Sequence, residues 1–409
     1  MKKIVFFFLM TILIASCHQE ELSSVPDEPE GKQPVFDLSE EEVLQGCIYV
    51  KLKEEPAGEV RVRSIGNTVT TGVKVLDRAA SSLKIERMER TFPYAGKFEE
   101  RTCKEGLHLW YNVWFSKETS ATRAATEVAF LDGIETAVPV PKIVSRATPE
   151  TAWSLYGVRT GEWLFNDPDL SRQWYLDNPG TESWQKKGAD IRLFDVWKQY
   201  NGNPAVIVAV VDGGINQEHP DLQDNLWTNP DEIPGNGMDD DGNGYVDDIH
   251  GYNFVDDNAT LVPHRHGTHV AGTIGATNNN GTGISSIAGG DGTSGSGVRL
   301  MSCQILKSLI SIGGEVASDP FIAAAIKYGA DNGAVISQNS WGYAATRAGR
   351  NASSYINPVH KEAIDYFIKY AGCDNKGEQL DGSPMKGGIV LFASGNANTS
   401  DPRIAAYQN

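Results

Sequence analysis

Two short runs in the middle of the chain contain side chains suited to acid–base chemistry. The apolar run from Val206 to Val211 ends in Asp212, and a run of small residues begins at His266. An apolar run without polar alternation predicts a strand of a parallel sheet buried on both faces, and ligands of such sheets gather where the strands end. Asp212 and His266 are therefore the first candidates for a reactive site.

The elements that must hold these two residues alternate along the chain. Beyond Asp212 we expect a helix that starts with His266, followed by strands and helices in turn. The expected strands are residues 298–306, 334–337 and 388–392, and the expected helices are 320–332, with Asp319 and Pro320 at its start, and 358–371. A further helix, expected at 191–200, leads into the strand that ends in Asp212. Such alternation predicts an α/β fold, with a parallel sheet covered by helices on both faces.

A smaller α+β domain is predicted before this sheet. Strands are expected at residues 47–52, 85–92, 107–115 and 134–143, and helices at 68–80 and 121–131. The order βαββαβ is the ferredoxin-like arrangement. Along 107–115 apolar residues alternate with amphipathic ones, so the second face of this sheet could dock on another surface.

Three motifs resemble those of the subtilisin-like serine proteases. The segment from Val210 to Ile215 is similar to the family's aspartate motif, and His266 to Thr273 is similar to its histidine motif. The sequence Ala393-Ser394-Gly395-Asn396, directly after an apolar strand, resembles its oxyanion motif. The family's triad runs in the chain order Asp, His, Ser. The resemblance extends from Asp167 to the end of the chain.

The resemblance implies a role for each matching residue. His266 would act as general base and then acid, Asp212 would orient it, and Asn396 would donate to the oxyanion during cleavage of a protein or peptide substrate. The segment from Ser340 to Gly342 resembles the family's substrate-binding segment, whose backbone pairs with an extended peptide. Trp341 would wall a pocket there, or it is a core aromatic.

The family's fourth motif, Gly-Thr-Ser-Met-Ala, is not found in the printed residues. Only residues 397–409 follow the oxyanion motif, and Ser400 is the single serine among them. Ser294 follows Gly-Thr but lies in a Gly/Ser loop without a helix. We therefore expect a chain truncated before the nucleophile and inactive as printed. The alternative is a non-catalytic, membrane-tethered peptide-binding pseudoprotease.

An acidic loop between the two motifs predicts a metal site. Asp239, Asp241, Asn243 and Asp247 place side-chain oxygens among glycines, as a structural calcium ion would require. The alternative is a solvated turn.

A metal hydrolase using His266 and His269 is a weaker hypothesis, because no glutamate stands between the histidines. His269 is expected to be a structural hydrogen-bonding group.

The N-terminus predicts export. Lys2 and Lys3 precede an apolar run too short to span a bilayer, and the run ends in Ile14-Ala15-Ser16-Cys17, which resembles the bacterial lipobox. We expect residues 1–17 to be a lipoprotein signal, with lipid attached to Cys17. The protein would then be anchored in the bacterial cell envelope, on its periplasmic or cell-surface side.

The domain boundaries follow from these features. A tether is expected at residues 18–45, the small domain at 46–144, a linker at 145–166 and the peptidase domain at 167–409. The family resemblance implies that the small domain is a propeptide that blocks the cleft as an intramolecular inhibitor.

Composition disfavours nucleic acid as a partner and leaves open whether the cysteines form disulfides. With 36 basic and 53 acidic residues the net charge is 36 − 53 = −17, which disfavours nucleic-acid binding. A disulfide between Cys47 and Cys103 is conceivable in an exported protein, whereas Cys303 in an apolar strand is expected to be a buried thiol.

Overall fold

The computed structural model describes most of the chain. The described residues are 38–54, 62–65, 68–72, 74, 77, 81, 83–145, 164–309, 314–316, 320–343 and 357–393. The predictions for Cys17, Asn396 and Ser400 lie outside them. Within the described part, no helix has the length and apolar content needed to cross a membrane.

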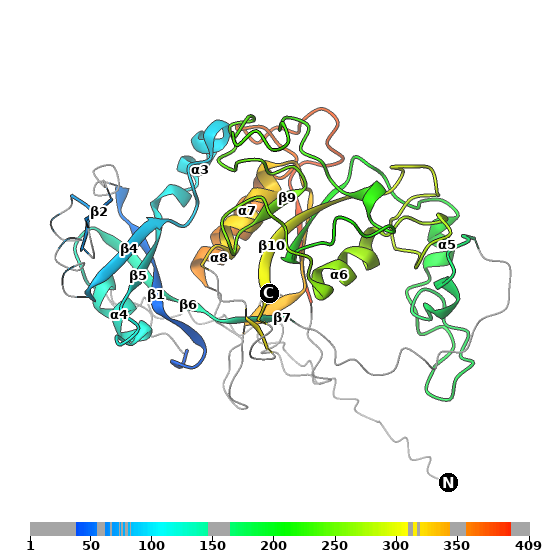
Figure 1. Ribbon diagram of the computed structural model, residues 1–409, viewed down its shortest axis with the longest axis horizontal. Coiled ribbons are helices and arrows are strands. Elements are labelled where there is room, and N and C mark those ends of the chain that lie inside the picture. Colours follow the sequence, from blue (N-terminus) through cyan, green and yellow to red (C-terminus); the bar gives the residue numbers. More distant parts are fainter. Residues whose placement is uncertain are drawn as a thin grey trace, which may run out of the picture. The chain divides into compact units, whose positions relative to one another are not determined.

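The N-terminal domain is a four-stranded antiparallel sheet. Its strands are β1 (Val43–Leu52), β4 (Ile85–Arg90), β5 (Trp110–Phe115) and β6 (Ile134–Pro141), in the order β4-β5-β1-β6. This is the strand order of the predicted ferredoxin-like arrangement. Helix α4 (Ala121–Ala129) packs on β1 and β6, where it covers one face of the sheet (Figure 1). The domain starts earlier than predicted, because β1 begins at Val43.

The second face of this sheet is also buried. Tyr49, Trp110 and Val138 belong to the same apolar cluster as Val359 and Ala363 of helix α8 (Pro358–Tyr370). The amphipathic face therefore packs against the rest of the chain, as its alternation predicted.

Three local predictions in this domain differ from the structure. Thr68–Thr70 is strand β3, paired with β2 (Arg63–Ile65), and is not the start of a helix, since β-branched residues favour strands. Leu107–Leu109 forms a 3-10 helix, η2, before β5. It follows a short 3-10 helix, η1 (Gly96–Phe98), and helix α3 (Glu99–Lys104), which the sequence analysis missed because six residues show no helical period.

The larger domain contains the predicted parallel sheet. Its strands are β8 (Ile207–Gly213), β9 (Gly251–Asn253), β10 (Arg299–Leu309), β11 (Gly314–Val316), β12 (Ile336–Asn339) and β14 (Ile389–Phe392). The order is β11-β10-β8-β12-β14, with β9 beside β10. All neighbours are parallel except β10 and β11, which form an antiparallel hairpin.

Helices cover both faces of this sheet, as predicted. Val208 and Val210 of β8 belong to one apolar cluster with Ala271 of helix α6 (Arg265–Gly275), whereas Ala209 and Val211 belong to a second cluster with helix α7 (Ile322–Asp331) and α8. The residues of β8 alternate between the two clusters because successive side chains of a strand point to opposite faces of the sheet. Figure 1 shows α6 on one side of β10 and α7 and α8 on the other.

Two helices of this domain begin two residues later than predicted. Helix α5 (Leu193–Trp197) has five residues, and its N-cap Arg192 has a left-handed backbone. Helix α7 begins after Phe321 as its N-cap, so the predicted cap at Asp319 is wrong.

The cysteines do not form disulfides in the described part of the chain. None of Cys47, Cys103, Cys303 and Cys373 is in a disulfide there, so the Cys47–Cys103 bridge is absent. Cys303 is fully buried, as expected.

Candidate active site

The structure brings Asp212 and His266 together, 54 residues apart in sequence. Asp212 Oδ1 lies 2.7 Å from His266 Nδ1, the carboxylate is fully buried and the imidazole is 12% exposed. Asp212 shares the face of β8 that packs on α6, because it lies two residues beyond Val210. The strand period therefore aims the carboxylate at the helix that carries the histidine.

A third histidine, His264, fixes the start of α6. Its backbone N–H donates to the Gly214 oxygen at 2.8 Å, and its Nδ1 accepts from the backbone N–H of His266 at 3.2 Å. This imidazole is the N-cap of the helix. The sequence analysis missed it, although a histidine two residues before the motif was a visible signal.

Two glycines allow the strand end and the helix to approach. A Cβ on Gly213 would meet the ring of His264 at 2.4 Å, and a Cβ on Gly267 would meet the Gly213 oxygen at 1.9 Å. Both distances are shorter than any real contact, so only glycine fits at either position. The close approach places His266 against Asp212.

The carboxylate of Asp212 is held on one side only. Its Oδ1 accepts from the Gly213 N–H at 2.6 Å as well as from the imidazole, while its Oδ2 is buried without a hydrogen-bond partner among the described residues. Because Nδ1 of His266 faces the carboxylate, Nε2 is the nitrogen assigned to proton exchange with a reacting group.

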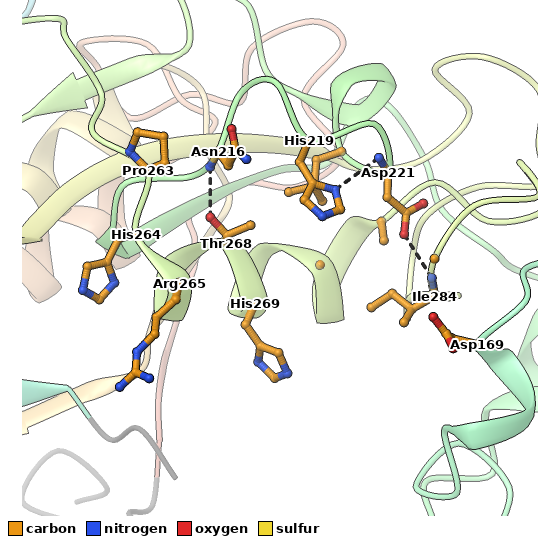
Figure 2. A pocket seen from close by; sticks show the side chains of 14 residues that line it. Asp169, Asn216, His219, Asp221, Pro263, His264, Arg265, Thr268, His269 and Ile284 are labelled. Carbon is orange, nitrogen blue, oxygen red and sulfur yellow. Dashed lines mark hydrogen bonds between the residues drawn. The ribbon is translucent and has the colours of Figure 1, made fainter. Parts of the chain in front are cut away.

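A pocket of about 510 Å³ lies on the flank of α6. His264, Arg265 and His269 line it, together with residues of the loop after β8 such as His219 (Figure 2). Asp212 and His266 do not line it, so the pocket adjoins the pair rather than containing it. Burial, and to a lesser degree the neighbouring His266, lowers the pKa of His269.

The candidate substrate-binding segment is paired with the end of the N-terminal domain. Strand β13 (Trp341–Tyr343) is antiparallel to β7 (Ile143–Ser145), with Gly342 opposite Val144. Ser340 precedes this strand, and its hydroxyl accepts from Gln338.

Trp341 is a core aromatic. Its side chain is 1% exposed and packs edge-on against Phe392 and His360. The structure thus supports the second interpretation of Trp341, and the backbone of this segment pairs with the extended chain of β7.

The acidic loop gathers three carboxylates, one of which was not predicted. Oxygens of Glu232, Asp239 and Asp241 lie within 4.8 Å of one another. Glu232 Oε2 is buried and has no hydrogen-bond partner among the described residues, and the residue is 7% exposed. Within the described residues, this is the one group of three or more carboxylate, imidazole or thiol side chains gathered closely enough to share a metal ion, and His266 and His269 are not part of it.

Asn243 and Asp247 have other partners. The Asn243 amide nitrogen donates to Asp241 and Asp248, and the two Asp247 oxygens accept from the backbone N–H groups of Asn236 and Gly237. Both residues shape the loop.

Ser294 does not resemble a nucleophile. It is exposed, in a turn between Gly292 and Gly295, and no helix begins there.

Comparison with known proteins establishes the class of protein that the parallel sheet and the buried Asp–His pair define. The profile described as the subtilase family matches residues 203–409, and the profile of the N-terminal domain of that family matches residues 48–180. The chain belongs to the subtilase family, which comprises serine proteases, and carries the propeptide domain of that family before the peptidase sheet.

Individual relatives match only parts of the chain. Subtilisin-like protease 1 of Plasmodium vivax is 38% identical over 134 residues, 32% of this chain and 19% of that protein. Kexin of Saccharomyces cerevisiae is 29% identical over 274 residues, 64% of this chain and 26% of its own length. The chain thus spans less than a third of the length of these curated relatives.

One solved structure supports the fold. Fervidolysin from Fervidobacterium pennivorans, described as a keratinolytic enzyme related to subtilisin, superposes with a TM-score of 0.51 at 19% identity. The match covers 89% of this chain and 42% of that one. At this identity the likeness concerns the fold alone.

Proposed function

We propose that the peptidase domain hydrolyses peptide bonds in proteins by an Asp–His–Ser mechanism, as a serine endopeptidase. The observation that carries the proposal is the 2.7 Å contact between the buried Asp212 and Nδ1 of His266. Asp212 holds the imidazole in one orientation and stabilises its charged form, and His266 Nε2 takes a proton from a serine hydroxyl and passes it to the leaving amine. Asn396 is the proposed oxyanion donor.

The serine of this mechanism is not assigned to a printed residue. Ser294 lies in an exposed turn, and Ser400 is outside the described residues. We therefore propose that a polypeptide of the 409 printed residues does not form the acyl-enzyme, whereas one continued through a Gly-Thr-Ser helix start does. The rival is a peptide-binding pseudoprotease, which would bind peptides in the same groove without cleaving them.

The N-terminal domain is the proposed intramolecular inhibitor of this groove. The pairing of β7 with β13 supports the proposal, because an extended chain beside the substrate-binding backbone occupies the place of a peptide. Burial of Tyr49 and Trp110 of the N-terminal domain against α8 adds apolar contact to the strand pairing.

A fluorophosphonate probe tests these proposals together. The continued polypeptide, started at Asp167, should be labelled at its added serine and should cleave a peptide. Residues 38–145 added in trans, which include all of β1 and β7, should slow the labelling. The printed chain and a His266→Ala variant of the continued chain should not be labelled. Labelling of Ser294 or Ser400 would refute the assignment, and a folded continued chain that binds peptide without cleaving it would favour the pseudoprotease.

Calcium is the proposed structural ion of the acidic loop. Three carboxylates lie together. Lys97 of the N-terminal domain adds one positive charge beside them, with its Nζ 3.3 Å from Asp241 Oδ2. The unpartnered Glu232 Oε2 is the oxygen that a hard cation would satisfy, and calcium prefers such ligands. Glu232, Asp239 and Asp241 would hold the ion, with Asn243 and Asp247 shaping the loop around it.

Calcium should raise the melting temperature of the protein. Binding to the folded state alone stabilises it by about 2.7 kcal/mol at a hundred times the dissociation constant. We expect the melting temperature in excess calcium to exceed that in chelator by several degrees, and Glu232→Gln to abolish most of the difference. Asp365→Asn, at an exposed pair on α8, is the matched control and should keep it. Identical curves with calcium and with chelator for the unaltered protein would leave the loop as a turn.

Lipid attachment at Cys17 is the proposed means of anchoring the protein in a bacterial envelope. The short apolar run followed by Ile14-Ala15-Ser16-Cys17 supports it. In a bacterial host, Cys17→Ala should move the protein from the membrane fraction to the soluble fraction, whereas Ser16→Ala should not. Membrane partitioning that survives Cys17→Ala would contradict the proposal.

A further inference from the structure

A fully buried arginine joins the N-terminal domain to the peptidase domain. Arg101 lies on α3, and its side chain is 1% exposed although it faces helices more than 200 residues away in sequence. Arginine is almost never fully buried unless its charge is paired. The surface that receives it must therefore be built for a guanidinium group.

Each nitrogen of the guanidinium has an acceptor on the peptidase domain. Nη2 donates to Asp331 Oδ1 at 2.6 Å, Nε donates to the Tyr366 hydroxyl at 2.6 Å, and Nη1 donates to the backbone oxygen of Cys373 at 2.8 Å. The three acceptors come from α7, from α8 and from the segment after α8. Their directions match the planar fork of arginine and not the single charged centre of lysine.

Aromatic rings surround the same group. The guanidinium carbon lies 4.4 Å from the ring centre of Phe98, and 5.5 and 5.4 Å from those of Tyr366 and Tyr370. Cation–π attraction of this kind strengthens when water is excluded. Phe98 belongs to the N-terminal domain, whereas both tyrosines belong to α8, so most of the pocket is a property of the peptidase domain.

The acceptor Asp331 has partners that do not depend on Arg101. Lys327, one turn earlier on α7, pairs with its other oxygen, and the Tyr366 hydroxyl donates to Oδ1 at 2.6 Å. Burial opposes ionisation of this carboxyl, but the charges of Lys327 and Arg101 and the hydrogen bonds hold its pKa below the ordinary value. An oriented acceptor that already has a lysine and a tyrosine partner therefore exists within α7 and α8 themselves.

We propose that the α7–α8 face carries a guanidinium-binding site that Arg101 fills in cis, and that the site binds an arginine side chain of another polypeptide when Arg101 is withdrawn. The ligand class is an alkylguanidinium ion. The neighbouring pair between Lys369 and Glu105 is half-exposed and contributes much less to holding the two domains together. Arg101 shares this face with Lys51 and Trp110, which both bond to Glu362 of α8, and with the apolar contacts of the N-terminal sheet to α8.

Chemical rescue of the full 409-residue chain tests the site. Arg101→Ala should lower the melting temperature by at least about 5 °C, because it leaves Asp331 and two other acceptors buried without their donor. Methylguanidinium at 10 mM should recover at least half of that loss, and methylammonium at 10 mM should not. A concentration of 10 mM is far too low for guanidinium to denature a protein.

Matched variants separate binding in the pocket from general effects. The unaltered chain, whose pocket is filled, should show no shift with methylguanidinium, and the double variant Arg101→Ala/Asp331→Asn should lose the rescue. Lys104→Ala, at an exposed position on the same helix, should leave the melting temperature within about 1 °C of the unaltered value. If Arg101→Ala does not fold unaided, the same comparison is made on the folded yield after dilution from urea.

Two outcomes would overturn the proposal. The first is rescue by methylguanidinium and methylammonium alike, which would show a charge effect without a shaped site. The second is no rescue of melting temperature or folded yield by methylguanidinium, which would show that Arg101 only joins the domains and that the face has no affinity of its own.

Discussion

Asp212→Asn should lower kcat about 10⁴-fold in a polypeptide continued through the family's serine segment, close to the loss known for the triad aspartate of subtilisin. The asparagine amide can bind Nδ1 in two ways: its oxygen accepts from Nδ1–H, or its N–H donates to an unprotonated Nδ1. It therefore does not hold the imidazole in the productive tautomer. It also removes the charge that stabilises the imidazolium. The fold should survive, because the change is isosteric at a buried position.

The measurement is steady-state cleavage of a peptide, with KM reported beside kcat. A loss confined to kcat fits a residue that orients the base, whereas a rise in KM alone would assign Asp212 to substrate binding. Asp224→Asn, in the 3-10 helix η5 (Gln223–Asn225), is a control and should leave kcat unchanged. If Asp212→Asn retains more than a tenth of kcat, the pair in the structure is not the catalytic one.

Acid should destabilise the protein through a buried histidine outside the candidate site, His360 of α8. This residue is fully buried, and its Nδ1 lies 2.9 Å from the Tyr343 hydroxyl. Burial lowers its pKa from 6.5 to about 3. A folded-state pKa below the unfolded value means that the unfolded chain binds the proton first. Stability is therefore complete above about pH 6.5 and falls as the pH drops towards 3, by about 5 kcal/mol in total.

Urea denaturation at pH 7.5 and pH 5 measures this effect. Over that interval the free energy of unfolding of the unaltered protein should fall by about 2 kcal/mol more than that of His360→Phe, which cannot titrate. Tyr343→Phe keeps the imidazole and removes only the hydroxyl, so it should retain the pH dependence. Equal pH dependence in the unaltered protein and in His360→Phe would show that the histidine is accessible to protons in the folded state.

Local pattern alone predicted most of the architecture. The unbroken apolar run of β8 indicated a strand buried on both faces, and the alternation of strands and helices after His266 indicated a covered parallel sheet. Errors were concentrated in short elements. Six-residue α3 and three-residue β3 are too short to show a period, and their conformation depends on neighbours distant in sequence.

The residues of the candidate site were also only partly predictable from the sequence. Sequence motifs identified Asp212 and His266, and the structure showed that they are in contact. Sequence motifs did not identify His264 or Glu232, because the roles of these residues depend on which backbone N–H or carboxylate lies beside them in space. Trp341 was left open between two roles, and only its burial in the core decided between them.

By itself, the sequence determined the family resemblance, the order of the domains, the two faces of β8 and the pair of residues proposed for catalysis. These are properties of local runs, in which residue type and period suffice. The tertiary structure alone decided that β7 lies against β13, that Glu232 completes the acidic cluster, and that Arg101 enters a pocket formed by α7 and α8. Each of these contacts joins groups that are far apart in the sequence, so no local pattern predicts it. Each forms because charged and backbone groups that become buried when the two sheets pack must be hydrogen-bonded or paired.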